Sequence, residues 1–392
     1  MTFGRAAATP ALGHDQARGT APSSVLQCGG SRLDGSARHI AAATIRGGVI
    51  PTGILSIGRA TPSLRVTQEQ SFQYSGYQGD AIRRLFLNTG IDFRHFYFEN
   101  APRLDEDSDQ LNRRYLRGAI ETGCKAARLC LEAAGLSPRD VDLFVVCTST
   151  GYVCPDIGSR LIGHMDLRPD VQRASMVGLG CAGAIPSLQR ACDFTQAHPG
   201  RIALMLAVEI CSACYYVDDT VETVVGSALC ADGAAAVLLT SGSLAESPYP
   251  EIVDFQSFLD PTHLDLVGLE HRNGKLRIVL GAQVRDVAFS LIQGALTPLL
   301  ERNSLSQSDI RFWVAHPGGR KVIENLENHL GLGASELSFS KAVLRNFGNM
   351  SSPTVLFVLD EVIRHGEPKP GDWGVMTALG PGMAAEAALL RW

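Results

Sequence analysis

The stretch GLGCAGAIPSLQRAC (178–192) decides the fold expected for this chain. The apolar residues ASMVGLG (174–180) predict a strand, and residues 182–197 continue with a helical pattern. Glycines on both sides of Cys181 allow a sharp turn and the close approach of a substrate. A thiol at the start of a helix faces the positive end of the helix dipole, which favours the nucleophilic thiolate. The pattern therefore indicates a reactive Cys181, and the alternative is a small buried cysteine in a packed turn.

Short apolar strands alternate with helical stretches from Pro51 onward, which is typical of α/β architecture. Besides 174–180, the first half of the chain contains four expected strands, at 54–58, 141–147, 201–210 and 234–240. A second helix is expected at 112–134. Residues 241–251, rich in Pro, Ser and Gly, predict a loop that separates this half from the next.

The second half repeats the order of the first. Residues 251–258 resemble an opening strand, and three further segments have a counterpart: 309–319 parallels 141–151, 344–362 parallels 176–194, and 372–380 parallels 201–209. An internal duplication is the economical interpretation, although two unrelated α/β units also look alike at this coarseness. We expect a flexible N-terminal extension (1–50), a half carrying the nucleophilic Cys (51–245) and a half carrying His and Asn (246–392).

Composition excludes several classes of protein. With 392 residues, 45% hydrophobic and 19% charged, the chain is an ordinary globular protein with room for two subdomains. A net charge of −5 gives no reason to propose nucleic acid as a partner. Ten scattered cysteines suit a reducing compartment, so we expect a cytoplasmic protein without a membrane span. Cys211-Ser-Ala-Cys214 has metal-site spacing, but no second such pair follows, and we expect no metal.

Two turns of the second half carry polar residues that complement Cys181. His316 ends an apolar strand in WVAHPGGRKVIENL (313–326), and Asn349 lies in NFGNMSSPT (346–354). Taken singly, a strand-end His is often structural, and an Asn beside Gly is common in plain turns. The duplicated architecture would bring the three turns together.

A thiol, an imidazole and an amide at one place suit one reaction well. The Cys181 thiolate attacks an acyl thioester and holds the acyl group covalently. A second thioester, malonyl-CoA, loses carbon dioxide and leaves an enolate whose oxygen needs hydrogen-bond donors. The N–H groups of His316 and Asn349 would form that oxyanion hole. Carboxylates need play no part, which fits their absence from these turns.

The motifs GCAGA, HPGG, FGNMSSPT and ALGPGMAAEA (378–387) resemble the type III polyketide synthases, the chalcone and stilbene synthase superfamily. The resemblance runs from about residue 52 to the C-terminus. It implies a thiolase-like fold, with two duplicated halves in an αβαβα layered arrangement, and a homodimer. It also implies a catalytic triad of Cys181, His316 and Asn349, acyl-CoA and malonyl-CoA as substrates, and no cofactor.

Carried over residue by residue, the resemblance describes an open substrate pocket. In VVGSALCADGAAA (224–236), Cys230 stands where plant members carry a gatekeeper Phe. The second gatekeeper position falls at Gly281, so both aromatic walls are missing. Cys211 and Cys214 replace residues that are often Thr, which makes the pocket more apolar. The lost rings leave room for a long acyl chain.

Three more residues follow from the resemblance. Ser351 belongs to the substrate pocket, and Cys154 falls where the family places a residue that reaches into the partner subunit's cavity. Arg84 matches one of the basic residues at the CoA tunnel mouth, whereas the neighbouring positions, Ala81 and Asn88, lack charge.

We therefore expect a polyketide synthase that extends a long-chain fatty acyl-CoA with malonyl-CoA and closes the product to an alkylpyrone. Gly281 offers no wall to bend the intermediate, which favours the pyrone over an alkylresorcinol formed by aldol closure. A fatty-acid synthase or carrier protein is a conceivable acyl donor. Two alternatives remain: a single condensation like that of ketoacyl-acyl-carrier-protein synthase III, and a catalytically silent binding protein. The intact triad argues against the second.

Overall fold

A computed structural model describes seven stretches of the chain: residues 51–98, 106–214, 217–218, 220–242, 247–281, 283–333 and 335–392. The expected N-terminal extension (1–50) lies outside them, as does the middle of the expected linker (243–246). All the described residues belong to one compact unit, Ala42–Trp392.

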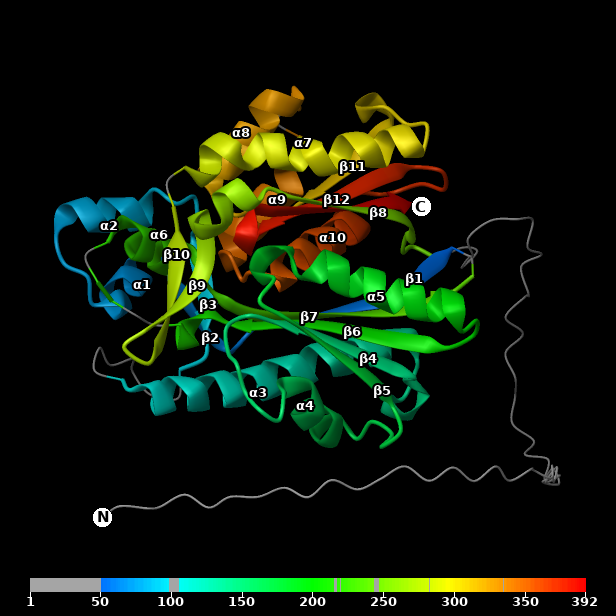
Figure 1. Ribbon diagram of the computed structural model, residues 1–392, viewed down its shortest axis with the longest axis horizontal. Helices are drawn as coiled ribbons and strands as arrows, with labels where there is room; N and C mark the ends of the chain where they lie inside the picture. The colour runs from blue at the N-terminus through cyan, green and yellow to red at the C-terminus, as the bar shows by residue number, and fades with distance from the viewer. Residues whose placement is uncertain are drawn as a thin grey trace, which may run out of the picture. The chain divides into compact units, whose positions relative to one another are not determined.

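Nine strands form one hydrogen-bonded sheet in the order β11-β12-β13-β8-β1-β7-β6-β4-β5. In chain order these strands are β1 (Thr52–Ala60), β4 (Leu143–Thr148), β5 (Gln172–Val177), β6 (Ile202–Ile210), β7 (Asp232–Ser241), β8 (Glu251–Leu259), β11 (Ile310–Ala315), β12 (Trp373–Gly380) and β13 (Ala384–Arg391). Strands β1 and β8 share only two residue pairs, Thr52 with Ile252 and Gly53 with Glu251. At this short junction the sheet divides into two stacked parts (Figure 1).

Helices cover both outer faces and fill the space between the two parts of the sheet, which gives five layers (Figure 1). The outer layers hold α3 (Ser108–Ala134) with α4 (Ile157–Met165), and α7 (Val284–Arg302) with α8 (Arg320–Leu330). The middle layer holds α5 (Ala184–Ala197) and α10 (Pro353–His365), and α10 packs on both β11 and β7. Its apolar residues, among them Leu188 and Phe357, belong to one fully buried core with both parts of the sheet.

The two parts of the sheet have the same topology. In the first, β4 and β6 are parallel, and β6–β7 and β7–β1 are antiparallel. In the second, β11 and β12 are parallel, and β12–β13 and β13–β8 are antiparallel. Strand β5 is added at the outer edge of the first part. The repeated order expected from the sequence is therefore present in three dimensions, and the layered α/β fold class is confirmed.

The remaining helices and strands are smaller, and most of them gather at one side of the layers (Figure 1). They are β2 (Leu64–Thr67), β3 (Phe93–Phe96), α1 (Gln68–Ser75), α2 (Asp80–Leu87), α6 (Val221–Leu229), α9 (Ser338–Phe347), β9 (Val267–Arg272) and β10 (Lys275–Leu280). Strands β9 and β10 form a separate antiparallel hairpin. Short 3-10 helices complete the chain: η1 (Pro138–Asp140), η2 (Gly180–Ala182), η3 (Cys211–Ala213), η4 (Pro261–Leu266), η5 (Gln307–Asp309) and η6 (Pro381–Met383).

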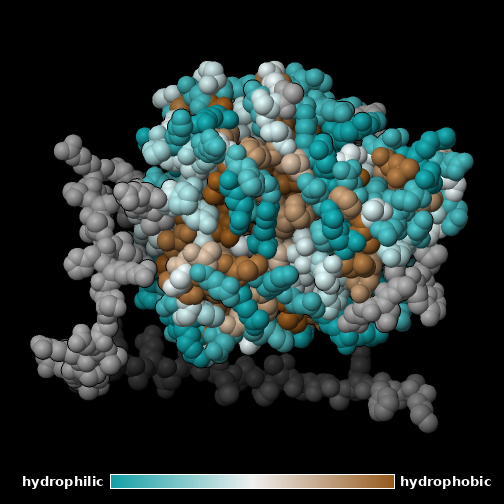
Figure 2. All heavy atoms as spheres, turned by 180° about the vertical axis from the view of Figure 1, so that it is seen from behind, coloured by the Kyte–Doolittle hydropathy of each residue, from teal (hydrophilic) through white to brown (hydrophobic). Residues whose placement is uncertain are grey.

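The expected elements agree with this structure except at their ends. The strand expected at 174–180 ends at Val177, because the glycine turn begins there, and the helix expected at 112–134 begins earlier, at Ser108. Asp107 caps that helix by accepting a hydrogen bond from the Gln110 backbone. No helix in the described part of the chain is long and apolar enough to cross a membrane. On the face shown in Figure 2, hydrophobic groups are interspersed with hydrophilic ones.

Candidate active site

Cys181 lies in η2, between strand β5 and helix α5, as the sequence predicts. The turn is held from both halves of the chain. The Gly180 N–H donates to the Ser149 hydroxyl at 2.8 Å, and a Cβ atom on Gly180 would lie 2.5 Å from Cδ of Pro381. Gly180 also has a φ of +49°, which favours glycine. The nucleophile is therefore fixed by the two halves together.

Asn349 and His316 approach the same place from the second half. The Asn349 Oδ1 atom lies 3.9 Å from the Cys181 sulfur and accepts a hydrogen bond from the Ser351 N–H at 2.8 Å. The Asn349 amide nitrogen donates to the carbonyl of Gly318, two residues beyond His316, at 3.2 Å. These bonds fix the amide plane and use one of its two N–H groups. The structure thus brings Cys181 and Asn349 together, and the bond to Gly318 joins Asn349 to the turn that follows His316.

Both titratable members of the triad are neutral at rest. Burial raises the pKa of Cys181 to about 12, and the adjacent Ser351 hydroxyl only partly offsets that rise. Burial also lowers the pKa of His316 to about 4. Burial thus opposes the thiolate that the helix dipole favours, because loss of hydration disfavours the charged form. The resting site holds a thiol and a neutral imidazole.

The imidazole of His316 is buried without protein partners. Its side chain is 8% exposed, and neither ring nitrogen has a hydrogen-bond partner among the described residues. Leaving a buried polar atom unsatisfied costs about 1–3 kcal/mol, so such atoms are rare outside functional sites. The ring is thus available to a substrate.

A small cavity beside the triad, the cysteine cavity, carries most of the expected pocket residues. It is lined by Ser71, Tyr74, Ser75, Phe96, Phe98, Cys211, Ser212, Cys214, Gly226, Ser227, Cys230 and Ile278. Cys230 connects it to the triad, because its backbone pairs with that of Asn349. The Cys211 and Cys230 thiols are close enough to interact, and the hydrogen bond with Cys211 lowers the pKa of Cys230. Three thiols and three aromatic rings make much of the lining apolar.

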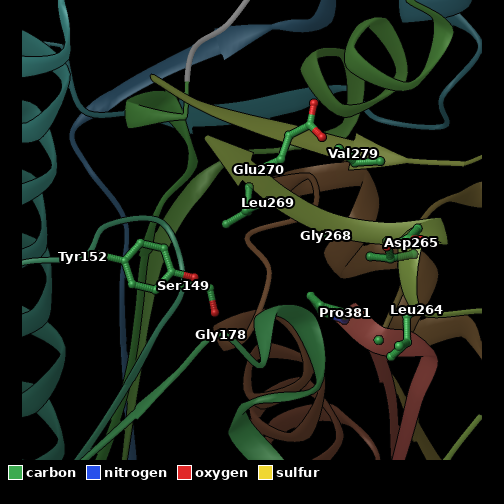
Figure 3. A pocket seen from close by; sticks show the side chains of 12 residues that line it. Ser149, Tyr152, Gly178, Leu264, Asp265, Gly268, Leu269, Glu270, Val279 and Pro381 are labelled. Atoms are coloured by element: carbon green, nitrogen blue, oxygen red, sulfur yellow. The ribbon is translucent and has the colours of Figure 1, made fainter. Parts of the chain in front are cut away.

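A second cavity, of about 370 Å³, lies under the β9–β10 hairpin and is called the hairpin cavity here. Its lining includes Ser149, Gly178 and Pro381, which surround the Cys181 turn. Figure 3 shows Tyr152 on one side of this cavity and the β9 residues Leu269 and Glu270 on the other. The triad is therefore bordered by two cavities, one reached past Cys230 and one past the glycine turn.

Glu209 is a buried carboxylate that the sequence reasoning missed. It is completely buried at the end of β6 and accepts hydrogen bonds from the Ser149 and Thr150 N–H groups at 2.9 and 3.0 Å. It also accepts one from the Ser352 hydroxyl at 2.8 Å, so it joins the two halves next to the triad. Burial raises the pKa of Glu209 to about 7. A carboxylate thus lies next to the triad turns although none lies in them; a lone acid in the apolar run 201–210 was the available signal.

Two further residues expected in the substrate pocket, Gly281 and Cys154, line neither of the two cavities. Gly281 follows β10 and lines neither cavity; a Cβ atom there would lie 3.2 Å from the Leu266 carbonyl oxygen. The β10 residues that do line the cavities are Ile278 and Val279, and β9 contributes Val267, Gly268, Leu269 and Glu270 to the hairpin cavity. Cys154 is exposed, on the loop that follows β4.

Arg84 is exposed on α2 and forms no ion pair within the described residues, whereas its neighbour Arg83 pairs with Glu69 at 2.8 Å. In the same described part of the chain, no group of three or more His, Cys, Asp or Glu side chains could hold a metal ion.

A duplicated, layered α/β fold with Cys, His and Asn turns meeting at its centre defines the thiolase-like condensing enzymes. Residues 252–392 match the family model of the chalcone and stilbene synthases, C-terminal domain, and residues 100–248 match that of FAE1/type III polyketide synthase-like proteins. The chain belongs to the type III polyketide synthases. It is an acyltransferase-type enzyme that condenses malonyl-CoA.

Individual relatives agree with this assignment. The chain is 36% identical to 1,3,6,8-tetrahydroxynaphthalene synthase of Streptomyces peucetius subsp. caesius, over 79% of this chain and 83% of the relative. It is 34% identical to the alpha-pyrone synthesis polyketide synthase-like Pks18 of Mycobacterium tuberculosis, over 80% of each chain. The crystal structure of PKS-I from the brown alga Ectocarpus siliculosus superposes with a TM-score of 0.82 at 28% identity, covering 88% of this chain and all of that one.

Proposed function

We propose that this polyketide synthase loads a long-chain fatty acyl group from CoA onto Cys181, extends it with malonyl-CoA and releases an alkylpyrone. The observation that carries the choice of starter is the lining of the cysteine cavity, whose volume of about 40 Å³ has to widen when an acyl tail enters. Cys230 lines this cavity together with Phe96 and Phe98, and its backbone pairs with that of Asn349. Apolar lining favours an acyl tail, at about 0.8 kcal/mol per buried methylene.

Loading begins with a neutral pair, so attack and proton transfer are coupled. His316, with a pKa of about 4, is an unprotonated base at neutral pH. It accepts the Cys181 proton as the sulfur attacks the acyl carbonyl, and CoA leaves as the thiol after taking a proton. The product is a thioester on Cys181.

Extension uses the hydrogen-bond donors that the protein leaves free. Malonyl-CoA loses its carboxylate as carbon dioxide, and the electron pair of the broken bond becomes the enolate. The His316 ring N–H and the second N–H of Asn349 bind the enolate oxygen. The enolate carbon then attacks the acyl carbonyl, and the Cys181 sulfur departs. The extended chain returns to Cys181 for a second extension. An enol oxygen of the resulting triketide then attacks its own thioester carbonyl, closes the pyrone ring and releases CoA as the thiol.

The proposed pyrone product is supported by a relative and not by Gly281. Gly281 lines neither cavity, so the missing wall at that residue stays a prediction. Support comes from the similarity to Pks18, whose name states alpha-pyrone synthesis. Aldol closure to an alkylresorcinol is the alternative outcome.

We also propose that Arg84 binds CoA phosphates and that the enzyme is a homodimer. Arg84 is exposed and without an ion pair in the described residues, which leaves its charge available. For the dimer, the supporting observation is the edge strand β5, whose last residue, Val177, is 51% exposed next to the similarly exposed Tyr152. An open edge strand with apolar neighbours is suited to pairing with a second copy.

A product assay tests the proposal. Purified enzyme is incubated with labelled malonyl-CoA and acetyl-, butyryl-, lauroyl- or palmitoyl-CoA, or with malonyl-CoA alone. Alkylpyrones formed with the highest kcat/KM from the two longest starters would support it. Product from malonyl-CoA alone, as the similarity to tetrahydroxynaphthalene synthase would suggest, refutes the long starter. A single extension refutes the polyketide scheme, and a requirement for a carrier protein refutes loading from CoA.

A further inference from the structure

Arg94 is a completely buried arginine beneath the active site. It lies in β3, and its NH1 group donates to the carbonyl oxygens of Ser227 and Cys230, both at 2.7 Å. Its NH2 group donates to the Ser71 hydroxyl, and the guanidinium lies 5.1 Å from the centre of the Phe96 ring. Burying a cation is costly unless its donors are satisfied, so a fixed set of acceptors is required.

The carbonyls that Arg94 binds belong to the end of α6, and the residues at this end are also hydrogen-bonded to Asn349. The Asn349 N–H donates to the Leu229 carbonyl at 2.9 Å, and the Ala231 N–H donates to the Asn349 carbonyl at 2.8 Å. Asn349 is therefore bonded to the residues on each side of Cys230. The Cys230 carbonyl, in the middle of this segment, is bonded to Arg94.

The aliphatic stem of Arg94 contacts the same turn from a second direction. Gly348 has a φ of +73°, and a Cβ atom built on it would lie 2.9 Å from Cγ and 3.0 Å from Cδ of Arg94. The stem thus fills the space beside the residue that precedes Asn349. One side chain supports both the segment to which Asn349 is bonded and the turn that carries it.

We propose that Arg94 is a positioning residue for Asn349, holding the α6 exit and the Gly348 turn so that the Asn349 amide meets the malonyl-derived enolate. The inference rests on the proposed role of Asn349 as an enolate donor. A donor displaced by about 1 Å loses on the order of a hundredfold in rate, so a residue that never touches substrate can control decarboxylation.

Two substitutions separate the parts of this role. Arg94→Lys keeps the charge and most of the stem but loses the planar fork that binds two carbonyls at once. Arg94→Met keeps the stem and loses the donors. Arg114→Met is the matched control, because Arg114 is also buried and donates to a backbone carbonyl, that of Ser212, at 2.9 Å.

The experiment measures carbon dioxide release from malonyl-CoA, acyl loading on Cys181 by mass spectrometry, and Tm for each full-length variant. We expect Arg94→Lys to lower decarboxylation about tenfold, and Arg94→Met further, while loading is retained. Arg114→Met lowers Tm without changing the ratio of decarboxylation to loading. An unchanged ratio in Arg94→Lys, which retains enough of the side chain to fold, overturns the proposal, as does an equal fall in both activities.

Asn349→Ala is measured in parallel to distinguish two kinds of failure. Normal decarboxylation in Asn349→Ala would remove the proposed role of Asn349 itself. Impaired decarboxylation in Asn349→Ala with an unchanged ratio in both Arg94 variants would leave that role intact and refute only the positioning by Arg94.

Discussion

Replacing Cys230 with phenylalanine would close the passage between the triad and the cysteine cavity. Cys230 lines this cavity together with Cys211 and Ile278, and its backbone pairs with that of Asn349. A ring at this position points into the volume that we assign to the acyl tail. We expect Cys230→Phe to discriminate strongly against long starters and weakly against short ones.

The size of the effect follows from the volume displaced. A phenyl ring in place of a thiol fills the room of about three methylene groups, and each buried methylene contributes about 0.8 kcal/mol. The loss for a starter long enough to reach the ring is therefore about 2.4 kcal/mol, or roughly 50-fold in kcat/KM. For acetyl-CoA, which ends before the ring, kcat/KM remains close to its original value.

Initial rates with acetyl- and palmitoyl-CoA, measured for the wild type, Cys230→Phe and Cys230→Ala, check this prediction. Cys230→Ala is the control, because it removes the thiol without filling the cavity and leaves the ratio of the two rates unchanged. An unchanged ratio in Cys230→Phe would show that the acyl tail does not enter the cysteine cavity. A loss for both starters alike would indicate damage to Asn349 instead.

Four further predictions concern the triad and its buried neighbours. Cys181→Ala forms no acyl-enzyme by mass spectrometry yet still releases carbon dioxide from malonyl-CoA, because the enolate donors remain. Asn349→Ala lowers malonyl-CoA decarboxylation by about a hundredfold, as for loss of one oxyanion donor, while loading of Cys181 persists. Folding lowers the pKa of His316 from 6.5 to about 4. As the pH falls from 6.5 toward 4, the unfolded chain binds this proton before the folded one does, so the wild type loses stability. In Tm scans over this range, His316→Gln shows a shallower decline. The pKa of Glu209 rises from 4.5 to about 7, so the wild type loses stability as the pH rises through this range, whereas Tm of Glu209→Gln stays level there.

Local patterns in the sequence were sufficient to predict most of the fold. Strand β6, for example, is recognisable by the apolar run IALMLAV, because it lies between helical layers. The β9–β10 hairpin was not predicted, because its strands, VGLEHR and KLRIVL, are half-buried and mix charged with apolar residues. Its place is decided by packing on α6, where Ile278 lies against Gly226.

The parts of the site that lie within short sequence motifs could be predicted. The glycine turn of Cys181, the strand end of His316 and the Asn349 turn are each recognisable from a few neighbouring residues. Glu209 was missed because its partners come from distant segments, Ser149 and Ser352, which only the folded chain brings together. The position of Gly281 relative to the cavities also depends on the hairpin, for which the sequence offered no register.

The burial that keeps Cys181 protonated also explains how the site supports two steps with one set of groups. In a permanent pair of thiolate and imidazolium, the His316 N–H would donate to the sulfur and would not be available to the enolate. In the resting site both groups are neutral, and the His316 nitrogens have no partner among the described residues. During loading the imidazole accepts a proton, and once the sulfur is acylated, the ring is free to donate to the enolate beside Asn349. The cost of burying an unsatisfied imidazole, about 1–3 kcal/mol, is therefore offset when a thioester is bound. Binding of substrate should accordingly stabilise the fold most in variants that retain His316, and an equal rise in Tm with malonyl-CoA in His316→Gln would contradict this reasoning.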